Sequence, residues 1–358
     1  MRKFDKLVYS IHKWTGLLAG LFLLLISVTG TILVFRDEID SALNSDLLFV
    51  EPADKRLTQT QLLQVIKEKY PTATLNGTAL FTGQATRSTM MELEQDHQRS
   101  MVYLNPYTGQ VLGSRLRNEI FVRKVLAIHE HLTLGKSGHL ILFLVGLSFI
   151  LSVVTGLWYY RKSLLSVFKI GVRTKNTYLL NADLHKWIGV SASLFLALMA
   201  ATGTFMHWEK VERMLDEIGQ EAPPPRPKED NSLMVNEIAF PVDSLVAVAS
   251  QAVAGFTPQF IAYPRHADEP LEVRGTRPES NRLLGVLTTS IAVDIASKTV
   301  KEIHHKEDGD LEQNMESAVE QLHFGDYGGL FTKIIYALGG LGLSVMTITG
   351  FVIWWKKR

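Results

Sequence analysis

The sequence predicts a membrane protein: an all-α bundle of four transmembrane helices, arranged as two parallel-repeat helix pairs, with two soluble α+β domains. Three observations lead to this fold class. Four stretches of 19 to 22 residues contain no Asp, Glu, Lys or Arg, basic residues gather in the short segments between some of them, and parts of the first half of the chain recur in the second half. Hydrophobic residues make up 46% of the chain, and they are bunched rather than evenly spread.

The four charge-free stretches are residues 17–35, 140–160, 187–208 and 334–355. Each is close to the ~20 residues that an α-helix needs to cross ~30 Å of hydrocarbon. The first stretch continues into charged residues without a small-residue cleavage site, so we expect a retained helix rather than a signal peptide. The expected organisation is helix one in 1–36, a soluble domain in 37–128, helix two in 129–160, a loop in 161–186, helix three in 187–208, a soluble domain in 209–322 and helix four in 323–358.

The charge distribution predicts the orientation of these helices. Segments 1–16, 161–186 and 356–358 together carry 13 Lys and Arg residues but only two acidic residues. Segments 36–139 and 209–333 hold 24 basic residues against 34 acidic ones. Short segments rich in Lys and Arg stay in the cytoplasm. We therefore expect both termini and the loop 161–186 inside the cell, and the two soluble domains outside.

An internal repeat relates the starts of the two halves. The sequence Ile-His-Lys-Trp-x-Gly around His12 recurs as Leu-His-Lys-Trp-x-Gly around His185, an offset of 173 residues. At the same offset, the Thr-Gly pair that ends at Gly30 recurs as the pair that ends at Gly203.

A second offset, of 194 residues, relates the ends of the two halves. It places His129 on His323 and the Thr-Gly pair at Gly156 on the pair at Gly350. Each half is then one helix outward, one soluble domain and one helix back. Two halves of equal orientation should be related by an axis along the membrane normal.

Each soluble domain shows one amphipathic helix followed by short strands. The helical patterns cover residues 57–70 and 241–254. Strand-like runs follow at 74–81, 89–93, 101–104 and 110–112 in the first domain and at 260–262, 271–274 and 291–293 in the second. The Pro-rich segment 222–228 predicts a stiff linker before the second domain.

Several of these segments resemble a known protein family. Residues 101–112, Met-Val-Tyr-Leu-Asn-Pro-Tyr-Thr-Gly-Gln-Val-Leu, look like the end of a PepSY domain. The His-Lys-Trp-x-Gly helix start, the helix exit Phe-Arg-Asp-Glu-Ile at 35–39 and His-Phe-Gly at 323–325 resemble the PepSY-associated transmembrane family. The resemblance covers nearly the whole chain. The second domain departs from the pattern, because Val-Asp-Ile-Ala-Ser-Lys at 293–298 replaces the Pro-Tyr-Thr-Gly turn.

This resemblance implies a multi-pass protein of the bacterial inner membrane with PepSY-like domains in the periplasm. Family members include accessories of iron and siderophore uptake, and at least one branch reduces ferric siderophores in the periplasm through two b-type haems. The implied activity is that of an oxidoreductase that passes electrons outward and releases iron(II). The implied partners are a ferric siderophore, membrane lipid and an electron donor, either a quinol or a cytoplasmic reductase. No nucleic acid partner is expected.

Histidines at helix ends are the candidate cofactor ligands. His12 and His185 occupy equivalent positions at the inner ends of their helices, and His129 and His323 are equivalent at the outer ends. Two imidazoles from different helices can bind one haem iron from both faces, so the two pairs predict two haems b per chain. A lone histidine at a membrane interface is more often only a polar group among lipid headgroups, and this alternative applies to each histidine taken singly.

Other residues near the helix ends have open roles. Three histidines without a repeat partner, His139, His207 and His131, are alternative haem ligands. Arg36 and Arg161 could pair with haem propionates, although the charge asymmetry across the membrane also accounts for them. The glycines of the Thr-Gly pairs either leave room for the macrocycle or allow close contact between helices.

The sequence also excludes several function classes. It contains no Cys, so disulfides, Cys-ligated iron–sulfur clusters and covalent haem attachment are ruled out. Walker, Gly-x-Gly-x-x-Gly, His-Glu-x-x-His and Gly-x-Ser-x-Gly motifs do not occur, and ATP hydrolysis, a nicotinamide or flavin site and classical protease chemistry are unsupported. The alternatives are a non-enzymatic PepSY protein that binds a peptide, protease or siderophore, and a siderophore or iron transport accessory. The charge-free spans weigh against an ion path.

Overall fold

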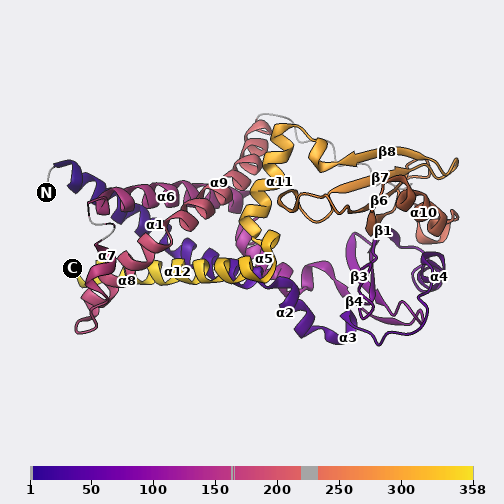
Figure 1. Cartoon of the computed structure of the whole chain (residues 1–358), viewed down its shortest axis with the longest axis horizontal. Helices are drawn as coiled ribbons and strands as arrows, with labels where there is room; N and C mark the ends of the chain where they lie inside the picture. Colours follow the sequence, from indigo (N-terminus) through magenta and orange to yellow (C-terminus); the bar gives the residue numbers. More distant parts are fainter. Residues whose placement is uncertain (1–2, 163, 165, 219–232, 358) are drawn as a thin grey trace. The chain divides into compact units, whose positions relative to one another are not determined.

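The computed structural model describes residues 3–162, 164, 166–218 and 233–357, which form two compact units (Figure 1). The helical unit comprises Met1–Arg36, Lys124–Ala222 and Val319–Arg358, and the sheet unit comprises Asp37–Arg123 and Pro223–Ala318. In the helical unit both termini lie at the same end (Figure 1). The side of the membrane on which this end lies stays a prediction.

Among the described residues, three helices are long and apolar enough to cross a membrane. They are α1 (Lys3–Val34), α6 (Lys136–Tyr160) and α12 (Gly329–Lys356), the last with the short helix η5 (Asp326–Gly328) before it. A fourth span is present if α8 (Thr177–Ser191) and α9 (Ser193–Asp216) are taken together. Length and composition thus support a membrane protein with three or four spans.

The fourth candidate span differs from the unbroken helix expected over 187–208. Its two parts, α8 and α9, meet at Ala192 with a bend of 70°. Serines flank the bend: the Ser191 hydroxyl donates to the Trp187 carbonyl and the Ser193 hydroxyl donates to the Val190 carbonyl. Such hydroxyls compete with the backbone hydrogen bonds of the helix, and sharp kinks are typical at Gly and Ser residues. Hydropathy alone did not predict this break.

The helices expected over 129–160 and 323–358 are each interrupted as well. Helix α5 (Phe121–His131) ends before α6, and α11 (Leu311–Phe324) ends before η5 and α12. Between α11 and α12, Gly325 has a φ of +74°, and a Cβ there would lie 2.7 Å from the Tyr336 ring. Only glycine fits this sharp turn without strain. The interruptions place His129 and His323 on the separate short helices α5 and α11.

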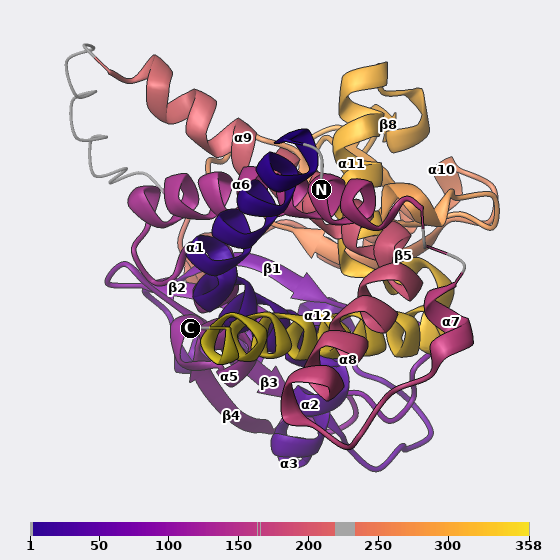
Figure 2. The same ribbon diagram turned by 90° about the vertical axis from the view of Figure 1, so that its left-hand side faces the viewer.

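The helices of the helical unit pack closely because small residues line their contacts. Helix α1 contacts α6 and α12, α9 contacts α6, and α8 contacts α12, as the end-on view in Figure 2 shows. A Cβ at Gly20 of α1 would lie 3.5 Å from the Thr347 side chain of α12. Ser27 and Ser344 share a buried hydrogen bond of 2.7 Å between the same two helices. Small residues of this kind let membrane helices approach one another. Large apolar side chains face outward, among them Leu18, Leu21, Leu144, Leu194, Leu338 and Phe351.

The sheet unit contains one antiparallel sheet of eight strands in the order β4-β3-β2-β1-β5-β6-β7-β8. Four strands come from each of the two soluble segments, and β1 pairs with β5, Gly77 lying opposite Ala262. The strands are β1 (Thr74–Ala79), β2 (Thr89–Gln95), β3 (Gln98–Leu104), β4 (Val111–Leu116), β5 (Thr257–Ala262), β6 (Leu271–Thr276), β7 (Thr289–Val293) and β8 (Val300–His305). The two segments therefore build halves of one sheet.

One hydrophobic core runs beneath both halves of the sheet. It packs α4 (Gln59–Lys69) and α10 (Val242–Ala252) against one face, with Ile66 and Leu245 fully buried. A capping box between Thr58 and Gln61 begins α4, and the carboxylate of Asp243 in α10 also accepts hydrogen bonds from the first backbone N–H groups of α4. The remaining short helices are α2 (Arg36–Leu43), α3 (Ser45–Leu48), α7 (Val167–Ile170), η1 (Arg117–Glu119), η2 (Val235–Glu237), η3 (Arg282–Leu284) and η4 (Lys306–Asp308).

The turns that connect β3 to β4 and β7 to β8 have the same backbone path despite their different sequences. In the first turn the Gly109 N–H donates to the Asn105 carbonyl, and in the second the Lys298 N–H donates to the Asp294 carbonyl. Gly109 has a φ of +76° and Lys298 has a φ of +56°. The second domain thus keeps the turn and changes its side chains, at the cost of a non-glycine residue in the left-handed region.

Candidate functional site

The helical unit brings the histidines of each repeat pair together. The first pair, His12 of α1 and His185 of α8, has ring centroids 6.1 Å apart with an angle of 74° between the rings. The second pair, His129 of α5 and His323 of α11, has centroids 6.2 Å apart and an angle of 50°. Each pair joins one histidine from each half of the chain. The structure thus brings together the histidines that the two repeat offsets relate, and their role as haem ligands stays a prediction.

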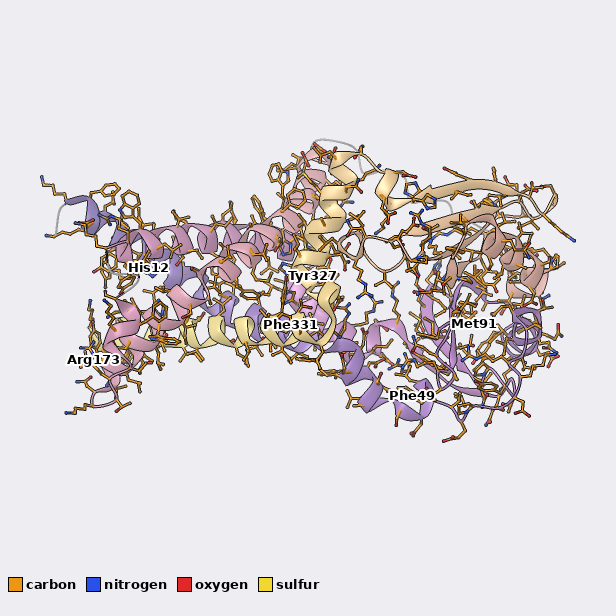
Figure 3. The ribbon with its side chains drawn as sticks, viewed as in Figure 1. His12, Phe49, Met91, Arg173, Tyr327 and Phe331 are labelled. Atoms are coloured by element: carbon orange, nitrogen blue, oxygen red, sulfur yellow. The ribbon has the colours of Figure 1, made fainter. Side chains whose placement is uncertain are left out.

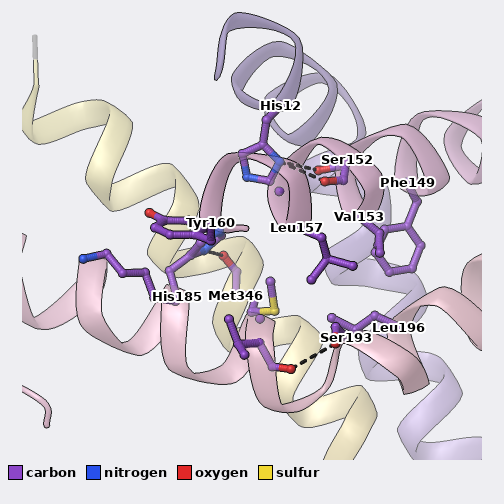
Figure 4. Close-up of a pocket in the computed structure, with 14 residues that line it drawn as sticks. His12, Phe149, Ser152, Val153, Leu157, Tyr160, His185, Ser193, Leu196 and Met346 are labelled. Carbon is purple, nitrogen blue, oxygen red and sulfur yellow. Dashed lines mark hydrogen bonds between the residues drawn. The ribbon is translucent and has the colours of Figure 1, made fainter. Parts of the chain in front are cut away.

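A pocket opens between the two rings of the first pair (Figure 4). Its lining residues surround about 530 Å³ of space, which includes open solvent. Its walls are mainly apolar and include Phe149, Leu157 and Leu196. Besides the histidines, its polar lining residues are Ser152, Tyr160, Lys186 and Ser193, and Tyr160 lies beside His185 (Figure 4). The pocket is thus mainly apolar and is lined by both histidines of the first pair.

In the first pair, each Nδ1 donates a hydrogen bond to a backbone carbonyl of a neighbouring helix. His12 Nδ1 lies 2.9 Å from the Ser152 oxygen in α6, and His185 Nδ1 lies 2.9 Å from the Met346 oxygen in α12. A carbonyl oxygen can only accept, so the hydrogen is on Nδ1. The other ring nitrogen, Nε2, then has a free lone pair that can bind a metal.

In the second pair the Nδ1 hydrogen of each ring is donated to a threonine hydroxyl instead. His129 Nδ1 lies 3.0 Å from Thr29 Oγ1, and His323 Nδ1 lies 2.9 Å from Thr202 Oγ1. Both hydroxyls donate their own hydrogen to a carbonyl one turn earlier in the helix, at 2.8 Å in each case. They are therefore acceptors toward the imidazoles, which again carry the hydrogen on Nδ1 and a free lone pair on Nε2.

Each of these four rings also lies directly over a glycine of a Thr-Gly pair. A Cβ at Gly30 would lie 2.9 Å from His129 Cε1, and one at Gly156 would lie 3.0 Å from His12 Cε1. The corresponding distances are 3.2 Å at Gly203 and 3.3 Å at Gly350. The sequence left two roles open for these glycines, macrocycle space and helix contact. In the structure they make room for the imidazole rings.

The two pairs lie near opposite ends of the helical unit. Helix α1 carries His12 near its start and Gly30, which lies beneath His129, near its end. These positions are separated by a rise of ~27 Å along the helix, close to the ~30 Å of the hydrocarbon layer. Figure 3 shows His12 toward the end of the unit that carries Arg173, away from Tyr327 and Phe331.

The three alternative ligands form a separate group. His139 of α6 has its ring centroid 5.6 Å from that of His131 in α5 and 5.5 Å from that of His207 in α9. His139 Nδ1 and His207 Nδ1 are 3.3 Å apart. Nothing in the sequence predicts that these three lie together, because neither repeat offset relates one of them to another. We call them the third group.

The two arginines predicted as propionate contacts have protein partners. Arg36 forms an ion pair with Asp326 and lies over the Phe324 ring, and Arg161 pairs with Asp5 at 3.1 Å. Their role toward a haem therefore stays a prediction. No role was predicted for Asp183 from the sequence. Its buried carboxylate accepts two hydrogen bonds of 2.8 Å from the Arg173 guanidinium, one at each oxygen. This pair ties the segment after α7 to α8, two residues before His185.

Comparison with known proteins identifies the family. The sequence profile of the PepSY-associated TM region matches residues 9–357, nearly the whole chain. No curated protein matches the sequence. The match includes the helices that hold both histidine pairs and the two segments that form the sheet. The chain thus belongs to the family of membrane proteins defined by the PepSY-associated TM region.

Proposed function

We propose that this protein is a b-type haem protein of the bacterial inner membrane that passes electrons outward to ferric siderophores in the periplasm and releases iron(II). The observation that carries the proposal is the common state of four histidines. They form two pairs, each Nδ1 donates to the protein, and each Nε2 has a free lone pair. Two such pairs, one near each end of the helical unit, provide the ligands for two haems.

The spacing of the rings fits this cofactor. Two imidazoles on opposite sides of one metal, each bound at ~2 Å, hold their ring centroids about 6 Å apart. The first pair has a separation of 6.1 Å and the second 6.2 Å. Zero Cys in the chain leaves imidazole as the main candidate for strong axial ligation. His12, His185, His129 and His323 would thus hold two haems b.

The chain's own residues position these ligands. The Nδ1–H bonds fix the tautomer and orientation of each ring, and the glycines beneath the rings allow the approach of the helices that carry them. Phe149, Leu157 and Leu196 give the pocket at the first pair apolar walls. Haem b, when bound, supplies one-electron transfer, and its potential depends on these surroundings.

The chemistry of the substrate explains the need for an electron. A siderophore holds iron(III) through hard oxygen donors, and iron(II) is held less tightly by the same donors. One electron added to the iron therefore weakens the complex and releases the metal. The donor inside the cell is proposed to be a quinol or a cytoplasmic reductase, since the sequence carries no nicotinamide or flavin motif.

An absorption spectrum tests the proposal most directly. Protein purified in detergent from haem-replete cells should show a Soret band and dithionite-sensitive α and β bands, with about two haems b per chain that acid acetone extracts. In proteoliposomes with a reduced quinol, it should convert a ferric trihydroxamate to iron(II), trapped by a ferrous chelator. A folded but colourless protein would support the non-enzymatic alternative and refute the proposal.

Reporter fusions test the orientation. A reporter after Arg358 or near Lys169 should report the cytoplasm, because the surrounding segments hold most of the excess positive charge. A reporter inserted near Ala222 should report the periplasm. The opposite pattern would place the donor and the siderophore on the wrong sides and overturn the outward direction of electron flow.

A further inference from the structure

The third group of histidines has a geometry that differs from that of the two pairs. His131, His139 and His207 come from α5, α6 and α9, three helices of the helical unit. The centroid separations around His139 are 5.6 Å and 5.5 Å, shorter than the 6.1 Å and 6.2 Å of the pairs. The spacing of two imidazoles that bind one metal depends on the angle between them at the metal.

Ligands on opposite sides of a metal and ligands at a tetrahedral angle have different spacings. Imidazoles bound at ~2 Å have ring centroids about 6 Å apart in the first arrangement and about 5 Å apart in the second. In the tetrahedral case the two bound nitrogens are about 3.3 Å apart. His139 Nδ1 and His207 Nδ1 are 3.3 Å apart. The third group therefore fits a small tetrahedral ion better than a haem.

His131 provides the third ligand. Its Nδ1 is buried and has no hydrogen-bond partner among the described residues, a costly state for a polar atom. As the side chains stand, the described residues contain no group of three that could hold a metal ion, so the site needs a side-chain movement. A turn of the His131 ring toward His139 would both satisfy this nitrogen and complete the site. Without metal, His139 and His207 share one hydrogen between their nitrogens.

The charges around the group favour moderate affinity. Glu130 in α5 attracts a cation at His139, whereas Lys210 and Arg213 in α9 repel it. Three neutral imidazoles suit zinc, copper, nickel and iron(II). A site with opposing charges nearby would bind such an ion and also release it. His131 lies two residues after His129, so the group is next to the second pair.

We propose that His131, His139 and His207 form a binding site for a divalent transition-metal ion, which receives the iron(II) that siderophore reduction releases. The identity of the ion rests on the proposed function. The iron(III) of the siderophore takes one electron supplied by the quinol or reductase. The bonds from iron to the siderophore oxygens break, these oxygens take protons from water, and bonds from iron(II) to the imidazole nitrogens form.

Zinc, which has no redox chemistry, is the probe for this site. Full-length protein should be purified without a histidine tag, stripped with a chelator, equilibrated with zinc and analysed for bound metal. We expect about one zinc per chain in the native protein. His139→Gln and His207→Gln should abolish this zinc and keep both haems and the native haem spectrum. His131→Gln should weaken zinc binding at least tenfold.

One control variant and four outcomes decide the proposal. His304→Gln, an exposed histidine of β8, should leave zinc binding unchanged. Absence of stoichiometric zinc, or its retention in His139→Gln and His207→Gln, would overturn the site. Loss of a haem from either variant would also overturn it, since the residues would then be haem ligands. Failure of the metal-free protein to bind about one iron(II) per chain under anaerobic conditions would refute the iron(II) assignment. Zinc binding by a protein without haem would refute the reductase function and the iron(II) assignment but keep the metal site.

Discussion

The first and second pairs use different acceptors for the same Nδ1–H group. In the first pair the acceptors are backbone carbonyls, at Ser152 and Met346, which no substitution can remove. In the second pair they are the hydroxyls of Thr29 and Thr202, which a single substitution removes. The first pair is therefore fixed by the backbone, and the second depends on the side chains that surround it.

The supporting helices differ in the same sense. His12 and His185 lie within the continuous helices α1 and α8. His129 and His323 lie on the short helices α5 and α11, each separated by a turn from the long helix that follows. We therefore expect substitutions to displace the histidines of the second pair more easily than those of the first. It is also the pair next to the third group and the one proposed to deliver electrons to the substrate.

Removal of a ligand should have the largest effect and should separate the pairs. In His12→Ala or His185→Ala, we expect about one haem per chain, with the remaining haem still reduced by dithionite. In His323→Ala the haem of the first pair should remain. All three should reduce a ferric siderophore roughly 100-fold more slowly with a membrane donor, because an empty axial position changes both haem retention and potential. Pyridine haemochrome analysis and difference spectra measure these changes.

His97→Ala, in the turn between β2 and β3, is the control and should change neither haem content nor reduction rate. If His12→Ala and His185→Ala keep both haems with unaltered spectra, the pairing is wrong. The ligands would then have to be sought among His139, His207 and His131, and the third group could not be an independent metal site.

Alanine beneath the rings should have the next largest effect. A Cβ would lie 2.9 Å from the ring at Gly30 and 3.0 Å at Gly156, but 3.2 Å at Gly203 and 3.3 Å at Gly350. Gly30→Ala must therefore displace His129, and Gly156→Ala leaves His12 less room than the other two positions leave their rings, which need only a small shift. We expect each of the two tighter variants to lose part of one haem, measured as haem per chain after gel filtration.

Gly16→Ala is the matched control, since it also lies in α1 and its Cβ would make an ordinary contact of 3.7 Å with Ser152. A haem content that falls equally in Gly16→Ala and Gly30→Ala would show that helix packing, not the position of the imidazole, sets retention. Each pair has one glycine with less room and one with more room beneath its ring. The order of these four glycines is therefore independent of the difference between the pairs in their Nδ1 acceptors, and an incorrect order would not affect that difference.

Much of the site followed from the repeat in the sequence. The two offsets identified which histidines are equivalent, and the structure places each equivalent pair side by side. The sequence could not show that the glycines make room for the rings, because this contact joins different helices. It also missed the carbonyls of Ser152 and Met346, since a backbone acceptor leaves no mark on residue type. The third group was missed because no offset relates its members.

The positions of most strands were predicted from the sequence, but the pairing of strands that lie far apart in the chain was not. The strands β1, β2, β3, β6 and β7 lie where alternation and turn residues predicted them. The pairing of β1 with β5 joins residues more than 180 positions apart, and a hydrophobic pattern cannot tell one sheet of eight strands from two smaller sheets. The bend at Ala192 was missed for a different reason. Hydropathy averages over a window in which two serines have little weight.

Substitution of the threonine acceptors should have a moderate effect that differs between the pairs. Among the described residues, Thr202 provides the only acceptor for His323 Nδ1, whereas His185 keeps the Met346 carbonyl when Thr349 is changed. Thr202→Val should weaken haem binding at the second pair by roughly 10–100-fold, and Thr349→Val should leave the first pair unchanged. Competition with apomyoglobin for haem measures both.

Thr29→Val should weaken haem binding less than Thr202→Val and more than Thr349→Val, because the Ile26 carbonyl is also close to His129. Thr202→Ser, which restores the hydroxyl, should recover native haem binding. Equal losses in Thr202→Val and Thr349→Val would refute the distinction between backbone and side-chain acceptors.

The smallest expected effect concerns the arginines at the two ends of the helical unit. Arg36 pairs with Asp326, three residues after His323, and Arg161 pairs with Asp5 near the start of α1. A positive charge favours the reduced form of a nearby haem, so its removal lowers the midpoint potential. Arg36→Gln should lower the potential of the second haem, and Arg161→Gln that of the first, each by roughly 10–50 mV because the charges are partly exposed and screened. Spectroelectrochemical titration resolves the two haems, and Arg36→Lys, which keeps the charge, should shift neither. If Arg36→Gln shifts the midpoint potentials of both haems equally, the two pairs do not have separate electrostatic environments.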